Sequence, residues 1–264
     1  MSQIAYTRTG SGTPIVLIHG IGSRWQVFEP IIGLLATRHE VIALDLPGFG
    51  ASPSDDSVEA SAPGYARWLA SFLSDHGIRA PHVVGNSMGG GIALELARNG
   101  HASRVTAFSP IGFWRQPGRV WCQVAVSGIR ELCRHAPRLV ERLTEPALTR
   151  GALLGAFYGR PARVSPHAAI ADVRGLIGAT SFPAACRAFS AYRFLDDDRI
   201  RRVPVTIAWG TRDVLLTYRT QSRRARAQLG WARHVALPRC GHLPFHDDPY
   251  ACASTILQNP PTPS

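Results

Sequence analysis

The stretch Val83-Val84-Gly85-Asn86-Ser87-Met88-Gly89-Gly90-Gly91 limits the fold of this chain more than any other part of it. The apolar, β-branched residues at its start are typical of a buried strand. The residues that follow it, from Ile92 to Arg98, have the spacing and composition of a helix. The sequence therefore predicts a strand that turns sharply into a helix at Ser87, with the serine side chain presented at the tip of the turn.

The glycines around Ser87 fit such a turn. Gly85 and Gly89 lie two residues before and after it, and neither has a Cβ atom that would collide where the strand and the helix pass each other. The N-terminus of the helix would stabilise negative charge that develops near Ser87 during a reaction. The alternative is a glycine-rich turn without a chemical role, because motifs of this length often occur by chance. Residues elsewhere in the chain must decide between the two.

Apolar runs and amphipathic segments alternate along the rest of the chain. Strands are expected at residues 4–8, 14–18, 41–44, 82–84, 104–108, 203–210 and 233–237. Further helices are expected at residues 25–37, 62–76, 218–229 and 248–257. Because strands that alternate with helices form parallel βαβ units, we expect an α/β fold with a doubly wound, mostly parallel sheet.

Strand-like runs are missing from residues 113–200, where short helical segments are interrupted by prolines. This stretch is too long for a single crossover between strands. We expect a helical cap there, inserted after the strand that follows the helix behind Ser87, over the carboxyl ends of the strands where such sheets bind ligands. The two parts of the core are then residues 1–112 and 201–258, and residues 259–264 form a disordered tail.

The balance of charges narrows the possible partners. The formal net charge is +11, and all of the 29 basic Lys and Arg side chains are arginines. The densest group, Arg219, Arg223, Arg224 and Arg226, falls on an expected helix, which favours a solvated helix face over an anion-binding patch. A nucleic-acid-binding protein needs its basic charge gathered on one face, within a recognisable module. No nucleic-acid partner is expected from this pattern.

Cysteine usage and hydropathy limit the class further. The five cysteines are widely spaced and include no C-x-x-C pair, so neither a disulfide framework nor a zinc site is expected. No other metal or cofactor is implied. There is no run of roughly 18 or more apolar residues, and no charged leader followed by an apolar stretch. We therefore expect a cytoplasmic protein without a membrane span, whose oligomeric state the sequence leaves open.

Three chemically distinctive residues, Ser87, Asp213 and His242, each follow an expected strand. Because the carboxyl ends of parallel strands meet at one edge of a sheet, these residues should lie together. The order serine, acid, histidine is the order found in α/β hydrolases, and it differs from the orders of chymotrypsin and subtilisin. No carboxylate occurs between Ser109 and Arg130, where some members of that family place the acid, which leaves Asp213.

Two further segments complete the resemblance. His19-Gly20 follows the second expected strand, and a loop from Asp45 to Ser52 follows the third. With the serine turn, Asp213 and Gly241-His242, they make the chain similar to capped α/β hydrolases, the group of esterases, epoxide hydrolases and C–C hydrolases. The likeness extends from about residue 4 to residue 257 and is weakest in the cap.

The chemistry of these side chains assigns their roles. Ser87 would be the nucleophile, His242 the base that takes its proton and later returns it, and Asp213 the group that orients the imidazole. The resemblance implies an oxyanion hole made by the backbone N–H groups of Met88 and Ile21. Gly22 is a close rival of Ile21 for this role and is also a candidate for contact with the substrate.

Other polar residues receive structural interpretations. His246 could compete with His242, but it lacks a preceding glycine and lies where the last helix begins. The acidic run from Asp196 to Asp198 is expected to be solvated. Asp45 matches a structural loop of the family, and His19 resembles the histidine that orients its oxyanion loop.

The substrate pocket is the least legible part of the sequence. Trp25 and Trp114 are candidate pocket residues, together with Gly22. As a group, the many aromatic residues of the expected cap favour an apolar acyl or alcohol pocket, although each of them taken alone favours a core position over a pocket position.

Three functions are open at this point. The first is a serine hydrolase that cleaves a carboxylic ester or related acyl substrate with an apolar moiety through an acyl-enzyme. The second is a C–C hydrolase of aromatic degradation, whose relatives share the Gly85–Gly90 pattern but carry tryptophan where this chain has Leu243, and a different loop at residues 21–24. A cofactor-free perhydrolase resembles the serine turn equally well, but usually has an aromatic residue at Ile21. The third is a ligand-binding protein on the same fold.

Overall fold

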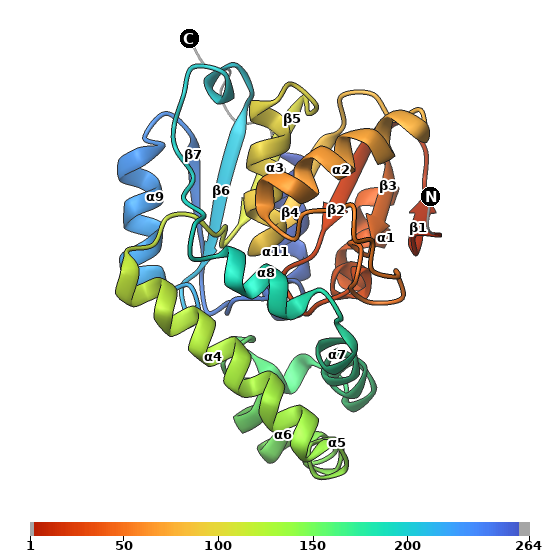
Figure 1. Ribbon diagram of the computed structural model, residues 1–264, viewed down its shortest axis with the longest axis vertical. Helices are drawn as coiled ribbons and strands as arrows, with labels where there is room; N and C mark the ends of the chain where they lie inside the picture. Colours follow the sequence, from red (N-terminus) through yellow and green to blue (C-terminus); the bar gives the residue numbers. More distant parts are fainter. Residues whose placement is uncertain (1–2, 259–264) are drawn as a thin grey trace.

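The computed structural model describes residues 3–258, so the expected tail at 259–264 lies outside the described residues. A single sheet organises this part of the chain (Figure 1). Its strands are β1 (Tyr6–Thr9), β2 (Thr13–Ile18), β3 (His39–Leu44), β4 (His82–Asn86), β5 (Arg104–Phe108), β6 (Val205–Gly210) and β7 (Arg233–Leu237). The expected strands are all present, although the first begins at Tyr6 and the sixth at Val205.

The order of the strands across the sheet is β1-β3-β2-β4-β5-β6-β7. β1 pairs with β3 antiparallel, and every other neighbouring pair is parallel. Central strands are buried on both faces, as their continuous apolar runs predict: Ile15 to Ile18 are fully buried. The predicted α/β fold with a doubly wound, mostly parallel sheet is confirmed.

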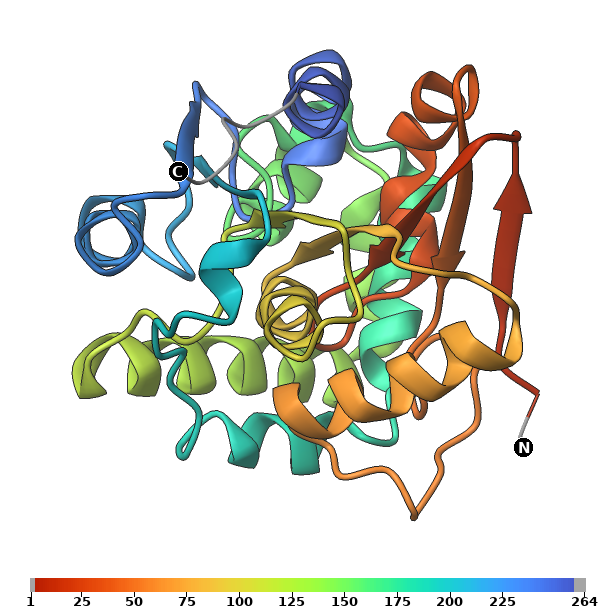
Figure 2. The same ribbon diagram turned by 90° about the horizontal axis from the view of Figure 1, so that it is seen from above.

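Helices cover both faces of this sheet (Figure 2). The helices outside the long connection between β5 and β6 are η1 (Trp25–Phe28), α1 (Glu29–Ala36), α2 (Ala62–Asp75), α3 (Met88–Arg98), η4 (Tyr218–Ser222), α9 (Arg223–Gln228), α10 (Pro244–Asp247) and α11 (Pro249–Leu257). α2 and α3 pack on one face with one apolar cluster, and α1 and α11 pack on the other with a second cluster. The expected helix at 25–37 begins as a 3-10 turn, and the one at 218–229 begins as a π-helical turn.

Side-chain caps define where several helices begin. The Ser61 hydroxyl accepts a hydrogen bond from the N–H of Gly64 at the start of α2, at 3.1 Å. The Asp248 carboxylate does the same for Ala251 at the start of α11, also at 3.1 Å. Both caps are followed by proline in the first turn, where its missing N–H costs nothing.

The connection between β5 and β6 is helical, and we call it the helical insertion. Its elements are α4 (Gln116–His135), α5 (Pro137–Thr144), α6 (Ala147–Leu154), η2 (Pro161–Arg163), α7 (Pro166–Gly178), α8 (Phe182–Ala188) and η3 (Ile200–Arg202). α4 to α7 extend beyond the end of the sheet at which β4 leads into α3 (Figure 1). Two small apolar clusters lie within this part, one around Cys133 and Val140 and the other around Leu154 and Tyr158.

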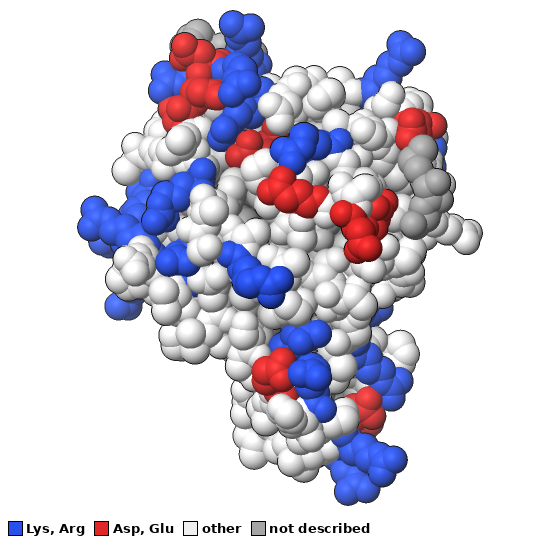
Figure 3. All heavy atoms as spheres, in the orientation of Figure 1, with Lys and Arg blue, Asp and Glu red and all other residues white. Residues whose placement is uncertain are grey.

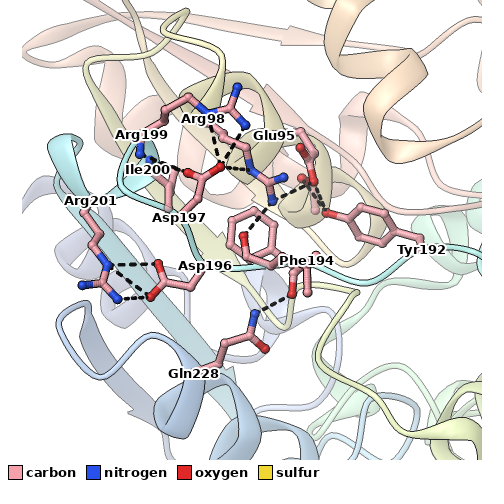
Figure 4. A network of polar contacts seen from close by, with 12 residues as sticks. Glu95, Arg98, Tyr192, Phe194, Asp196, Asp197, Arg199, Ile200, Arg201 and Gln228 are labelled. Carbon is pink, nitrogen blue, oxygen red and sulfur yellow. Dashed lines mark hydrogen bonds and ion pairs between the residues drawn. The ribbon is translucent and has the colours of Figure 1, made fainter.

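A polar network joins the end of the insertion to α3 (Figure 4). Glu95 is buried in α3, accepts a hydrogen bond from the Tyr192 hydroxyl at 3.1 Å and forms an ion pair with Arg98 at 3.3 Å. The Arg98 guanidinium in turn lies 4.5 Å above the ring centroid of Phe194. Burial raises the pKa of Glu95, while Arg98 favours its ionised form. The contacts fasten the residues after α8 to the helix behind Ser87.

The same network corrects the expectation that the acidic run after Leu195 is simply solvated. Asp196 is half-buried and pairs with Arg201 at 2.6 Å, and Asp197 pairs with Arg199 at 2.9 Å. Only Asp198 of the three is exposed. The expectation was wrong for Asp196, whose side chain is only 13% exposed because Arg201 folds back onto it, whereas the Asp197 side chain is still 31% exposed.

The arginine group expected on a helix face lies on η4 and α9. Arg219, Arg223 and Arg226 are exposed, and Arg224 is half-buried. Figure 3 shows blue side chains without red ones over this part of the molecule and the neighbouring N-terminal part of α4. Within residues 3–258, no helix is both long and apolar enough to cross a membrane.

A buried histidine in β4 makes the stability of the fold depend on pH. Burial lowers the pKa of His82 to about 3, and one ring nitrogen lies 2.9 Å from the Thr106 hydroxyl. In the unfolded chain a histidine takes up its proton near pH 6.5. The stabilisation that neutral His82 contributes is therefore complete above about pH 6.5 and is lost as the pH falls toward 3. Between neutral pH and pH 5, the free energy of unfolding should fall by about 2 kcal/mol for this reason.

We expect the His82→Gln variant to lose less stability than the wild type between pH 7 and pH 5. The measurement is the free energy of unfolding in urea at both values. His101→Gln, at an exposed histidine, is the matched control and should retain the wild-type slope. An unchanged slope in His82→Gln would show that another group carries this pH dependence.

Candidate active site

Ser87 is the single residue between the end of β4 and the start of α3. Its φ of +57° and ψ of −116° lie outside the regions that residues with side chains favour. Backbone hydrogen bonds hold it there: its N–H donates to the carbonyl of Phe108 at 2.9 Å, and its own carbonyl accepts from two further N–H groups at 3.1 Å. The strand, sharp turn and helix predicted from the sequence are present at this point.

The flanking glycines are required by close backbone contacts. A Cβ on Gly85 would lie 2.0 Å from the carbonyl oxygen of Gly89, and a Cβ on Gly89 would lie 2.1 Å from that of Ile18. Both distances are too short for any side chain. The prediction that these two positions must lack a Cβ atom is confirmed.

Asp213 and His242 form a buried pair at the neighbouring strand ends. Asp213 follows β6 and His242 follows β7, and the imidazole Nδ1 lies 2.8 Å from Oδ2 of the carboxylate. The other carboxylate oxygen, Oδ1, accepts hydrogen bonds from the N–H groups of Leu215 and Leu216 at 3.0 and 2.9 Å. These two donors fix the carboxylate and leave Oδ2 to the histidine.

Asn86 and Asp247 hold the loop that carries His242. The side-chain amide of Asn86 donates to the backbone carbonyl of His242 at 2.9 Å. The buried Asp247 carboxylate accepts from the N–H of Gly241 at 2.7 Å and from those of Gly159 and Arg160 in the insertion at 2.8 and 2.6 Å. The insertion and the histidine loop therefore share one carboxylate as their anchor.

Sequence reasoning missed this role of Asp247. Its partners at residues 159 and 160 lie 88 and 87 positions away, so no local pattern reports them. The only local signal is its place beside the helix-capping Asp248, which by itself indicates a helix start.

We expect the Asp247→Ala variant to be destabilised by about 3 kcal/mol or more, because it leaves three backbone N–H groups without their acceptor. Asp247→Asn, which retains one acceptor oxygen, should be intermediate. Urea unfolding measures both effects, with Asp198→Ala at an exposed carboxylate as the control. A loss below about 1 kcal/mol in Asp247→Ala would mean that water replaces the carboxylate without cost.

His19 orients the loop after β2. Its Nε2 accepts a hydrogen bond from the N–H of Leu46 at 3.0 Å, so the proton of the neutral ring belongs on Nδ1, which lies 2.7 Å from the carbonyl oxygen of Gly20. Burial lowers the pKa of His19 and keeps the ring neutral. Asp45 ties the neighbouring loops by accepting from the N–H groups of Trp25 and Ala51 at 2.6 and 2.8 Å.

Ile21 and Met88 are the residues whose N–H groups the resemblance implies for an oxyanion hole. Among the described residues, 3–258, no backbone carbonyl in the loops and turns accepts a hydrogen bond from either of these two N–H groups. Gly22 follows Ile21 with a φ of +70°, and a Cβ there would lie 2.4 Å from the Leu176 side chain. The loop is thus packed directly under the insertion.

A cavity of about 330 Å³ lies between these loops and the insertion. Ser87 and His242 line it, as do Gly20, Ile21 and Gly22. The insertion contributes mostly apolar side chains: Val126, Ile129, Leu132, Val140, Ala152, Leu153, Leu154, Ala156, Phe157, Val173 and Leu176. Two thiols, Cys122 and Cys133, also face it, and burial raises the pKa of each, which keeps them protonated. Such a lining suits an apolar ligand.

The two tryptophans expected at the pocket are not among the residues that line this cavity. Trp25 begins η1 and packs with the α1 and α11 side of the core. Trp114 is buried, donates its indole N–H to the carbonyl of Tyr192 at 3.0 Å and packs against Phe189. The expectation for both was wrong, because each indole is engaged in the core.

His246 does not compete with His242 for Asp213. Its ring packs edge-on against that of Tyr158, with 5.8 Å between the centroids. In the part of the chain that the structure describes, no three or more His, Cys, Asp or Glu side chains are grouped as metal ligands would be.

Comparison with known families decides what this arrangement belongs to. Residues 15–255 match the alpha/beta hydrolase family. The chain belongs to that family. The resemblance seen in the sequence is therefore confirmed, and the match begins within β2 and includes β3 to β7.

Relatives and solved structures agree with this assignment. An uncharacterized protein of Mycobacterium tuberculosis is 30% identical over 93% of this α/β hydrolase and 74% of its own length. A pimeloyl-[acyl-carrier protein] methyl ester esterase of Aeromonas hydrophila is 39% identical over 36% of each chain. The structure of a thermophilic esterase from Thermogutta terrifontis, 21% identical, has a TM-score of 0.73 and covers 96% of this chain and 91% of its own, which supports the fold.

Proposed function

We propose that this α/β hydrolase is a serine hydrolase that cleaves carboxylic esters with an apolar moiety through an acyl-enzyme. One observation carries the proposal. A serine on a strained strand–helix turn shares an apolar cavity with a histidine whose other ring nitrogen is held at 2.8 Å by a buried carboxylate. This is the set of groups that activates a hydroxyl and shields the reaction from water.

In this mechanism the Ser87 hydroxyl oxygen attacks the ester carbonyl carbon while His242 takes the hydroxyl proton on Nε2. The tetrahedral intermediate collapses, its bond to the alcohol oxygen breaks, and His242 gives the proton to the leaving alcohol. Water then attacks the acyl-enzyme, with His242 again accepting and returning a proton, and the carboxylic acid leaves Ser87 free. Asp213 holds Nδ1 protonated throughout, which leaves Nε2 as the nitrogen that can act as the base.

The N–H groups of Met88 and Ile21 would receive the negative charge of the tetrahedral oxygen. Met88 is the first residue of α3, whose N–H groups have no acceptor within the helix. His19 holds the neighbouring Gly20 carbonyl and thereby the direction of the loop. One such donor contributes about 3 kcal/mol to lowering the barrier.

Apolar side chains around the rest of the cavity favour an apolar acyl or alcohol group. The methyl ester esterase named above acts on an ester, which is the same bond class. No prosthetic group has a part in these steps.

Labelling with a fluorophosphonate, read by intact mass and peptide mapping, tests the proposal. We expect a single adduct on Ser87 and turnover of p-nitrophenyl esters with an optimum in acyl chain length. An adduct without turnover of any ester would favour the second function considered, cleavage of a C–C bond. Folded protein that takes up no label would favour a ligand-binding role and overturn the proposal.

A further inference from the structure

One carboxylate lines the otherwise apolar part of the cavity that the insertion encloses. It belongs to Asp172 on α7, which lines the cavity together with Tyr158. A carboxylate in apolar surroundings is costly unless it is paired. Its partners therefore indicate what it is for.

Two groups already pair with Asp172. The Tyr158 hydroxyl donates to its Oδ2 at 2.9 Å, and the Arg24 guanidinium lies 3.4 Å from its Oδ1. Burial raises the pKa of Tyr158 well above 10, so the hydroxyl stays a donor. Burial also raises the pKa of Asp172, while Tyr158 and Arg24, and more distantly His246, favour the carboxylate.

These partners leave part of Asp172 unused. A carboxylate has about four acceptor positions, and the two contacts occupy one on each oxygen. The longer contact, to Arg24, is at the limit of a hydrogen bond. The Asp172 side chain, on α7 of the insertion, keeps 23% of its surface exposed. A group whose only role was to tie elements together would be closed off from the cavity, and this one is not.

The position of Asp172 places it within reach of a bound substrate. Arg24 follows the cavity residue Ser23 and lies three positions after Ile21, on the loop after β2, which we call the oxyanion loop from the role proposed for Ile21. Its side chain rests on Gly175 of α7, where a Cβ would lie 3.3 Å from the Arg24 Cδ. Tyr158 touches His246, four positions after His242. The cluster thus lies between α7, the oxyanion loop and the histidine loop.

We infer that Asp172 accepts a hydrogen bond from a hydroxyl group on the carbon chain of the substrate, so that hydroxylated aliphatic esters are preferred over plain ones. This rests on the proposed ester hydrolysis. A neutral donor fits best, because Arg24 would repel a second cation and Asp172 would repel a substrate carboxylate. The chain itself packs on the apolar residues of α4 and α6, and Tyr158 orients the carboxylate.

Matched pairs of p-nitrophenyl esters test this inference, each pair made of a straight-chain acid and its ω-hydroxy analogue over a series of chain lengths. At the chain length that brings the hydroxyl to Asp172, we expect kcat/KM to be about 10- to 100-fold higher for the hydroxylated ester, as for a hydrogen bond to a charged group. The difference should lie mainly in KM, because this contact is made equally in the ground state and the transition state.

Two variants locate the effect. Asp172→Leu has a similar volume and no acceptor, and it should bring the ratio of kcat/KM values within each pair close to one. Asp172→Asn, which keeps the shape and one acceptor oxygen, should reduce the preference and guards against poor folding of the first variant. Glu141→Leu is the matched control. Glu141, on α5, pairs at 2.8 Å with Arg174 of α7, the helix that carries Asp172, but it does not line the cavity. This variant should keep the full preference.

A binding measurement separates this inference from the proposed function. In the Ser87→Ala background, we expect the hydroxylated member of a methyl ester pair to bind with the lower Kd by the same factor. Equal kcat/KM within every pair, equal Kd values, or a preference that survives in Asp172→Leu would overturn the subsite and leave ester hydrolysis standing. Failure of wild type to hydrolyse either member of any pair, with the hydroxylated esters still bound preferentially, would overturn ester hydrolysis alone.

Discussion

Ser87→Ala is expected to lower kcat for p-nitrophenyl esters by about 10⁶-fold, leaving only the residual catalysis supplied by binding and the oxyanion hole. In the proposed mechanism, the variant removes the hydroxyl oxygen that forms the acyl-enzyme. KM should change little, because the hydroxyl contributes to the chemical step far more than to binding the chain. Steady-state kinetics together with the loss of fluorophosphonate labelling measure the effect.

Ser109→Ala is the matched control for this experiment. Ser109 directly follows the neighbouring strand β5, is buried and also has a positive φ, of 42°, but it does not line the cavity. Its replacement should leave kcat within a few-fold of wild type. The Ser87→Ala protein must be free of contaminating wild-type enzyme. If such a preparation retains more than a small fraction of the wild-type activity, another nucleophile carries the reaction.

The second large effect is expected from Asp213→Asn, with a loss in kcat of about 10⁴-fold. The geometry gives the reason. Oδ1 accepts two backbone N–H groups, so the amide of an asparagine would place its oxygen there and turn its NH₂ group toward His242. An NH₂ group donates, and it would therefore stabilise the tautomer with the proton on Nε2. That tautomer cannot take the proton of Ser87.

The kinetics of Asp213→Asn should show this tautomer directly. We expect KM close to wild type, a depressed kcat throughout the neutral range, and slowed fluorophosphonate labelling, since that reaction also needs the base. Asp198→Asn, at an exposed carboxylate, controls for the loss of one charge. A decrease smaller than about tenfold would contradict the role assigned to Asp213.

Much of this arrangement is predictable from the sequence because it depends on rules of the parallel sheet. Ser87, Asp213 and His242 each follow a strand with a recognisable apolar run, and parallel strands end at the same edge. The glycines around Ser87 report a close backbone approach that any fold with this turn must have. Neither the grouping of the three side chains nor the need for these glycines depends on how side chains that are distant in the sequence pack.

The predictions that failed depend on such packing. Whether Trp114 faces a cavity or the core is decided by the carbonyl of Tyr192, 78 residues away. The roles of Asp247 and Asp172 were not predicted at all, for the same reason. Two partners of Asp247 lie in the insertion, and Arg24, the partner of Asp172, is 148 residues away from it. Helical segments of the insertion could be expected from their composition, but their arrangement around the cavity rests on contacts between α4, α5, α6 and α7 that no periodicity encodes.

The backbone angle of Ser87 has a consequence for how this chain can change. A residue with a side chain held at a φ of +57° and a ψ of −116° costs about 1–3 kcal/mol, and glycine would adopt the same angles with far less strain. The substitution that would relieve this turn is therefore the one that removes its hydroxyl. Selection for thermal resistance alone would favour losing the serine. If Ser87 is the nucleophile that we propose, the chain gives up conformational stability for reactivity at this position.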